Sequence, residues 1–174
     1  MTSTAMQVFA SYLHLLAVAV YLGGSIAMEF VLGPAQKFIP PAQAQVVGQK
    51  SADRFLVLVW TALALFPISG MLLFFAIGAQ HTSDFFGHSY GQTLFTMMML
   101  WVVLVVNGTL ITFVFRPKLA EKAGAGTTGA AMSDRMKQKE LAATWISRIT
   151  RADLAIALVV VLLGASLSYG NGLL

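Results

Sequence analysis

Four side chains in or beside the apolar segments of this 174-residue sequence could bind a metal ion or a haem iron. His14 lies in the first apolar segment, Met71 in the second and Met97 in the third, and His88 precedes the third. Imidazole and thioether groups are donors that suit Cu(I), and the same pair can ligate a low-spin haem. The residue types therefore predict a copper site or a b-type haem site.

His14 is the strongest candidate, because ionisable groups at membrane depth are costly and are functional-site candidates by default. A step of seven residues places Tyr21 on the same helical face, which we expect to point into the protein. We predict His14 and His88 as the preferred ligand pair, with His81 delivering an ion or capping the site. The structural alternative is a buried His14 hydrogen-bonded to a hydroxyl or carbonyl, with the methionines serving as flexible packing residues.

Membrane-spanning helices must hold these candidates. The chain is 57% apolar and 10% charged, whereas soluble domains have about 25% charged residues. A bilayer-spanning helix needs about 20 apolar residues, and charge-poor windows of that size predict four spans, over residues 6–31, 55–77, 92–115 and 152–170. Because lipid leaves the backbone few alternatives to helices, we predict an all-α integral membrane protein, a single up-down bundle of four helices over residues 1–174.

The basic residues predict the orientation of this bundle. All 11 Lys and Arg residues lie in two connectors, between Lys37 and Arg54 and between Arg116 and Arg151. By the positive-inside rule these connectors are cytoplasmic, and both termini lie on the outer, periplasmic side. Since topology and anionic lipid head groups explain the basic surplus, we expect lipid but no nucleic acid among the partners.

The two basic connectors differ in composition. Pro40 and Pro41 predict a turn followed by a short interfacial helix before the second span. Residues 123–133 are rich in Gly, Ala and Thr and predict a flexible cytoplasmic linker. Ser133 is then placed to cap a polar helix that continues into the fourth span.

Charged residues at the cytoplasmic ends of the spans are expected to neutralise one another. Glu29 ends the first span, Arg54 begins the second, and Arg151 and Asp153 begin the fourth. Interfacial charges of this kind usually fix helix register. We therefore predict structural ion pairs among these four residues, and an interhelical hydrogen bond from Asn107 in the third span.

Four landmarks follow one another along the chain. They are His14-Leu-Leu-Ala-Val-Ala-Val-Tyr21-Leu-Gly23-Gly24, Arg54-Phe55 with Ser69-Gly70, Tyr90-Gly91-x-x-Leu94, and Arg148-Ile-Thr-Arg151-Ala-Asp153. This pattern resembles the membrane domain of the copper resistance protein D family over nearly the whole chain. The family usually has Trp in place of Tyr21, Lys in place of Met97 and Glu in place of Asp153. The helix-one pattern is also similar to small membrane haem proteins such as the four-helix type of protoporphyrinogen oxidase.

The resemblance implies copper binding or uptake in the bacterial inner membrane, at the periplasmic half of the bundle. A periplasmic copper carrier or a larger membrane complex would then be the partner. Two alternatives stay open: a redox protein with b-type haem held by His14 and by His88 or a methionine, and a cofactor-free structural subunit. The chain has no cysteine and no recognisable arrangement of nucleophile and base, so no catalytic residue is predicted and we do not expect an enzyme.

Overall fold

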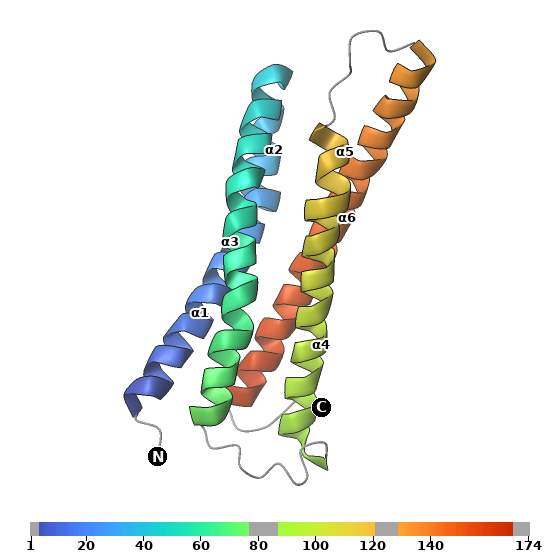
Figure 1. Cartoon of the computed structure of the whole chain (residues 1–174). Coiled ribbons are helices and arrows are strands. Elements are labelled where there is room, and N and C mark those ends of the chain that lie inside the picture. Colours follow the sequence, from blue (N-terminus) through green and yellow to red (C-terminus); the bar gives the residue numbers. More distant parts are fainter. Residues whose placement is uncertain (1–3, 77–86, 121–128, 169–174) are drawn as a thin grey trace.

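The computed structural model describes residues 4–76, 87–120 and 129–168, and it contains four helices that are long and apolar enough to cross a membrane. Consecutive long helices run in opposite directions (Figure 1). The described residues contain no strand. The predicted all-α class with four membrane-spanning helices is confirmed, while the orientation of the termini stays a prediction.

The first spanning segment is α1, Thr4–Ile26. It continues without a break through a π-helical segment, η1 (Ala27–Leu32), and then through the short α2 (Gly33–Ala35) and η2 (Gln36–Phe38). A π-helical turn has an i→i+5 hydrogen bond and is found mostly as a single turn inside α-helices. The first spanning segment, Thr4–Phe38, therefore has 35 residues, more than the about 20 that a bilayer requires.

The second spanning helix is longer than predicted. We expected a turn and a separate interfacial helix before residue 55, but α3 runs continuously over Pro41–Ala76. Proline is tolerated in the first turn of a helix because its missing N–H would have no partner there. The Gln and Ala residues that follow are good helix formers, and nothing in residues 42–54 ends the helix.

The third spanning segment is α4, Ser89–Thr109, followed by a second π-helical segment, η4 (Leu110–Phe115), and by α5 (Arg116–Ala120). The fourth is α6, Gly129–Ser168. The predicted linker over 123–133 is wrong for residues 129–133, which belong to α6, and its remaining part lies outside the described residues. Ser133 is consequently inside the helix and does not cap it.

The four helices form two pairs. Helix α1 packs along α3, and α4 packs along α6, with further contacts between α1 and α6 (Figure 1). The core between the pairs contains these buried side chains: Ala17, Tyr21, Ala62, Leu63, Leu104 and Ala157. Many large apolar side chains elsewhere are exposed, including Phe9, Leu15 and Phe113. An apolar surface of this kind is suited to lipid, which the confirmed spans require.

One hydrogen bond between the pairs replaces a backbone hydrogen bond that is missing from α3. Pro67 lies inside this helix and has no N–H, so the carbonyl of Leu63, four residues earlier, lacks its usual helical donor. The indole Nε1 of Trp101 on α4 donates a hydrogen bond to that carbonyl over 3.0 Å. Since an unsatisfied carbonyl is costly in an apolar medium, this contact joins α4 to α3 at the centre of the protein.

Candidate functional site

His14 lies at the seam between α1 and α3, in the part of the protein far from the basic connectors. Its Nδ1 is 2.8 Å from Oγ of Ser69 on α3. The imidazole also packs edge-on against Phe66, with ring centroids 5.6 Å apart. Ser69 is completely buried, and a Cβ built at Gly70 beside it would be in ordinary van der Waals contact with Cε1 of the ring, at 3.9 Å. The imidazole of His14 thus packs against the small residues Ser69 and Gly70 of α3.

The hydrogen bonds of Ser69 fix the tautomer of His14. The Ser69 hydroxyl lies 2.6 Å from the carbonyl oxygen of Leu65 and 3.2 Å from that of Phe66. Carbonyls only accept, so the single hydroxyl proton points at them, and Ser69 Oγ must accept the proton of His14 Nδ1–H. The other ring nitrogen, Nε2, then has a lone pair that can accept a hydrogen bond or bind a metal ion.

His14, Phe66 and Tyr21 form a row of three aromatic rings that runs from this seam toward the middle of the protein. Phe66 packs edge-on against Tyr21 as well as against His14, and the centroids of Tyr21 and Phe66 are 6.1 Å apart. Tyr21 is 5% exposed, and its backbone carbonyl accepts a hydrogen bond from Ser25 Oγ over 2.7 Å. Phe66 therefore lies between the imidazole and the phenol, and it separates His14 from the region that Tyr21 faces.

Among the described residues, the contacts of His14 are with Ser69 and Phe66 and not with the other predicted ligands. Met71 is 61% exposed and follows Ser69 by two positions on α3, which is about 200° around the helix. Met97 is partly buried, and its Cε lies 3.5 Å from a Cβ built at Gly164 on α6. His88 is exposed at the start of α4. His81 lies outside the described residues, within which no group of three or more His, Cys, Asp or Glu could hold a metal ion.

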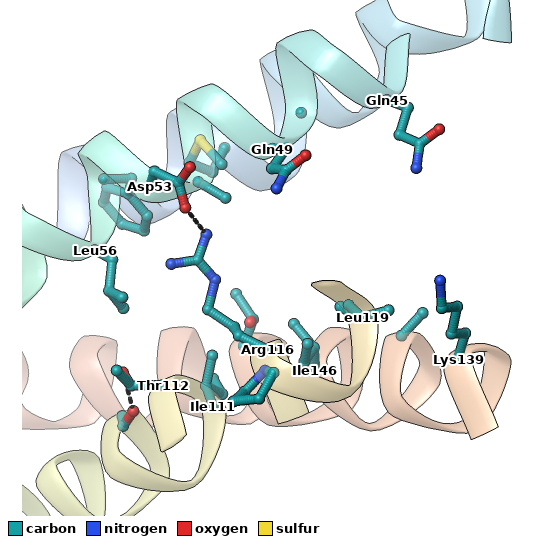
Figure 2. Close-up of a pocket in the computed structure, with 18 of the residues that line it drawn as sticks. Gln45, Gln49, Asp53, Leu56, Ile111, Thr112, Arg116, Leu119, Lys139 and Ile146 are labelled. Atoms are coloured by element: carbon teal, nitrogen blue, oxygen red, sulfur yellow. Dashed lines mark hydrogen bonds and ion pairs between the residues drawn. The ribbon is translucent and has the colours of Figure 1, made fainter. Parts of the chain in front are cut away.

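A large cleft opens between the two helix pairs at the end that carries the basic connectors (Figure 2). Its volume is about 1500 Å³. Leu56 and Val59 on α3 and Leu104 and Ile111 on the α4 segment give it mostly apolar walls. Tyr21 and Asp153 lie among the lining residues. The cleft therefore reaches the core of the protein, where the aromatic row from His14 ends.

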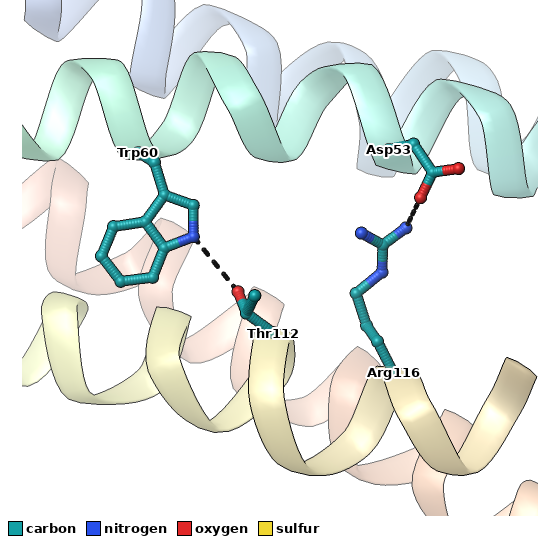
Figure 3. A network of polar contacts seen from close by, with 4 residues as sticks. All are labelled: Asp53, Trp60, Thr112 and Arg116. Carbon is teal, nitrogen blue, oxygen red and sulfur yellow. Dashed lines mark hydrogen bonds and ion pairs between the residues drawn. The ribbon is translucent and has the colours of Figure 1, made fainter.

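Polar side chains bridge the cleft from α3 to the α4 segment. Arg116 donates a hydrogen bond to Asp53 in an ion pair, and Trp60 Nε1 donates over 3.2 Å to Oγ1 of Thr112, which lines the cleft (Figure 3). Figure 2 shows that Gln45, nearer the mouth, extends from the same wall as Asp53. An ion pair and a hydrogen bond therefore connect these two walls.

The residues predicted to form ion pairs are arranged in three ways. Arg151 Nε donates to Glu29 Oε1 over 2.7 Å, which joins α6 to the end of the first helix. Arg54 is exposed and has no ion-pair partner within the described part of the chain. Asp153 is 8% exposed and accepts a hydrogen bond from Asn107 Nδ2 over 2.7 Å. Asn107 thus makes an interhelical hydrogen bond, and its acceptor is the carboxyl group.

Two contacts of this region were not anticipated from the sequence. Ser69 was noted only as part of a landmark, although a serine before a glycine in an otherwise apolar span could have indicated a polar partner for His14. The pairing of Asp53 with Arg116 joins residues 63 positions apart. No local pattern predicts which of several charges on one side of the membrane will meet.

The family of the chain follows from comparison with known sequences. The sequence model described as copper resistance protein D matches residues 49–167. The chain belongs to the copper resistance protein D family. Membership confirms the predicted resemblance, associates the protein with copper resistance and, with its four spanning helices, makes it a multi-pass protein of the inner membrane. No curated protein and no solved structure gives a match.

The family match has a boundary that matters for the site. It begins at residue 49, inside α3, and ends near the end of α6. Ser69, Met71, Met97 and Asp153 lie inside the matched range, whereas His14 and the rest of α1 precede it. The predicted resemblance over nearly the whole chain is thus supported for the last three landmarks, and the role of His14 depends on its own geometry.

Proposed function

We propose that this copper resistance protein D family member binds Cu(I) at His14, in the half of the membrane remote from the basic connectors, as part of copper binding or uptake. The observation that carries the proposal is the hydrogen bond between His14 Nδ1 and Ser69 Oγ. Metal-ligating histidines almost always donate their second ring N–H to an oxygen acceptor, which fixes the tautomer and orients the ring. Ser69 supplies that acceptor here.

A thioether is the best partner for Nε2 of His14, because Cu(I) prefers soft ligands. Of the two methionines considered, Met97 is the better candidate. Its side chain packs inside the protein against Gly164 of α6, whereas Met71 is 61% exposed on the far face of α3. Methionine is unbranched and rotates easily, so Met97 can adjust to an ion that reaches the seam.

The entry route in this proposal starts at the end of the bundle where α4 begins. His88 flanks the first residue of α4 and is exposed. We infer that His88, together with His81 in the connector before it, receives copper there and passes it to the seam. By the positive-inside rule this end is the periplasmic one, and a periplasmic copper carrier is the partner that fits it.

The test is a Cu(I) affinity measurement on the purified full chain in detergent, under anaerobic conditions, by competition with a chromogenic Cu(I) chelator. We expect His14→Ala to abolish binding. Ser69→Ala should weaken it by about 10-fold to 100-fold, which is the usual effect of losing a residue that orients a metal ligand. Ser25→Ala is the matched control, since Ser25 is a buried serine that hydrogen-bonds a backbone carbonyl without touching an imidazole.

Three outcomes contradict the proposal. If His14→Ala binds Cu(I) as tightly as the unmodified protein, the site is elsewhere. If the purified protein shows a Soret band that His14→Ala removes, it is a b-type haem protein in which His14 ligates iron. If the protein binds neither copper nor haem, the hydrogen bond from His14 to Ser69 is structural and the chain is a cofactor-free subunit.

A further inference from the structure

Asp153 on α6 is a carboxyl group inside a membrane-spanning segment, and its hydrogen-bond partner among the described residues, Asn107, is neutral. The side chain is 8% exposed, and Asn107 Nδ2 donates a hydrogen bond to its Oδ1 over 2.7 Å. Arg151, two positions earlier, is already paired with Glu29. Within the described part of the chain, no Lys, Arg or His forms an ion pair with Asp153.

Among the described residues, the groups near Asp153 on the neighbouring helices do not supply a positive charge. Tyr21 on α1 lines the same cleft as Asp153, and Asn107 is on α4. On α3, Asp53 is the charged residue that lines the cleft, and it is paired with Arg116. Arg116 follows Asn107 by nine positions, which is about 13 Å along a helix. The carboxyl thus lies deeper than these charges of the cleft.

A buried carboxyl without a cation must acquire one or bind a proton, because an isolated charge is expensive away from water. A proton fits this site better than copper does. Carboxylate, amide and phenol oxygens are hard donors that suit Cu(I) poorly. Asn107 can donate to Oδ1 of Asp153 whether the acid is ionised or neutral, and this leaves Oδ2 to take and release the proton.

The cleft gives this carboxyl a route to water. Asp153 lines it together with Arg116 and Lys139, and Figure 2 shows Lys139 farther along the cleft than Arg116. A volume of about 1500 Å³ is ample for a chain of water molecules, each of which occupies about 30 Å³ in the liquid. Polar groups at successive depths, from Gln49 to Thr112, can hydrogen-bond to such a chain.

We propose that Asp153 is a proton-binding site that exchanges its proton through the cleft with water on the side of the basic connectors. Phe66 packs against both His14 and Tyr21, and His14 is not among the residues that line the cleft. The proposal does not depend on copper binding at His14. Its failure and the failure of the proposed copper site are therefore distinguishable.

The first experiment labels the full chain in detergent with dicyclohexylcarbodiimide, which reacts with protonated carboxyl groups, and locates the adduct by mass spectrometry. We expect Asp153 to be labelled, and its labelling to fall by about tenfold or more from acid to alkaline pH because the ionised group is unreactive. Glu29 and Asp53, which are ion-paired, should be labelled far less, and Asp153→Asn should lose the adduct. The measurement on unmodified protein does not depend on the variant folding.

The second experiment tests the water route, and it uses the absence of cysteine from the chain. Gly108→Cys introduces a thiol that lines the cleft beside Asn107. Val106→Cys is the matched control, because Val106 is at nearly the same depth of α4 but 50% exposed on the surface and not in the cleft. Thiols react as thiolates, which form in water. A membrane-impermeant maleimide should therefore label Gly108→Cys at least about tenfold faster than Val106→Cys.

The same reagent, applied to one face of sealed vesicles at a time, identifies the side from which the cleft fills. Labelling of Gly108→Cys should occur from the face that carries the basic connectors. Two results overturn the proposal: an Asp153 that stays unlabelled or whose labelling is independent of pH, and a Gly108→Cys thiol that reacts no faster than the thiol of Val106→Cys.

Discussion

The seam between α1 and α3 and the cleft between the two helix pairs involve equally apolar helices, yet the first is closed and the second is open. Along the seam, small side chains such as Ala10 and Ala17 on α1 and Ser69 on α3 are at most 1% exposed. The cleft walls instead meet through the ion pair between Asp53 and the long side chain of Arg116. In lipid, helices gain little from burying apolar surface, and small residues decide where backbones approach closely.

This difference separates two kinds of polar site in one protein. At the seam, close packing holds His14 against a single serine in one orientation. At the cleft, Asp153 has a neutral partner on one side and open volume on the other. The closed region is therefore suited to holding a ligand in fixed geometry, and the open region to exchanging a small ion with solvent.

The largest effect is expected where the seam is tightest. A Cβ built at Gly24 lies 2.5 Å from Cε2 of Phe55, whereas one built at Gly23 meets nothing within 4 Å. Gly24→Leu should therefore destabilise the protein by about 1–3 kcal/mol through overpacking, and Gly23→Leu should be nearly neutral. The free energy of unfolding in mixed detergent and dodecyl sulfate is the measurement. Equal losses for the two variants would show that the α1–α3 contact is not limited by side-chain size.

A comparable effect is expected where α4 meets α3. Trp101→Phe leaves the carbonyl of Leu63 without its donor, which should cost about 1–3 kcal/mol because that group is buried. Pro67→Ala restores a backbone N–H to the same carbonyl, so adding it to Trp101→Phe should recover part of the loss. Trp60→Phe is the control at the cleft, since its acceptor Thr112 also hydrogen-bonds the carbonyl of Gly108. The prediction is wrong if Pro67→Ala rescues nothing in unfolding measurements.

The floor of the cleft offers a third test. Asn107→Leu removes the donor to Asp153, and a buried acceptor that loses its partner costs about 1–3 kcal/mol. Replacing both residues, by Asn107→Leu with Asp153→Leu, removes the acceptor as well and should be less destabilising than Asn107→Leu alone. Thermal unfolding of Asn107→Leu, of Asp153→Leu and of the double variant in detergent makes the comparison. If the double variant is the least stable of them, Asn107 and Asp153 contribute more to stability than the hydrogen bond that each provides to the other.

The sequence was sufficient to predict the spanning helices and the face of α1 that carries His14, because both follow from local composition and helical periodicity. It was not sufficient to predict Ser69 as the partner of His14, which depends on the register of two helices whose contacting residues are 55 positions apart. The same limit applies to Arg116, for which periodicity offers several acidic partners of equal rank.

The errors of prediction occurred at the helix starts. Two prolines and a polar stretch were interpreted as a turn and a separate helix, but Pro41 is the first residue of α3, where proline is compatible with the helix. Ser133 is similarly within α6, since Gly129 already begins that helix. A residue that can cap a helix does so only where the residues before it are not already helical.

The smallest effect is expected from the ion pair between Asp53 and Arg116, and its size reports on the contents of the cleft. The two side chains are 56% and 24% exposed, respectively. A pair in water contributes about 0.2–1 kcal/mol and weakens as salt is added. A double-mutant cycle with Asp53→Asn and Arg116→Gln should give a coupling free energy in this range, and added salt should reduce it. A larger coupling that is insensitive to salt would mean that the mouth of the cleft is dry, because charges attract more strongly in a medium of low dielectric constant. The water route to Asp153 would then be excluded at its entrance, and the difference between the closed seam and the open cleft would be one of shape alone.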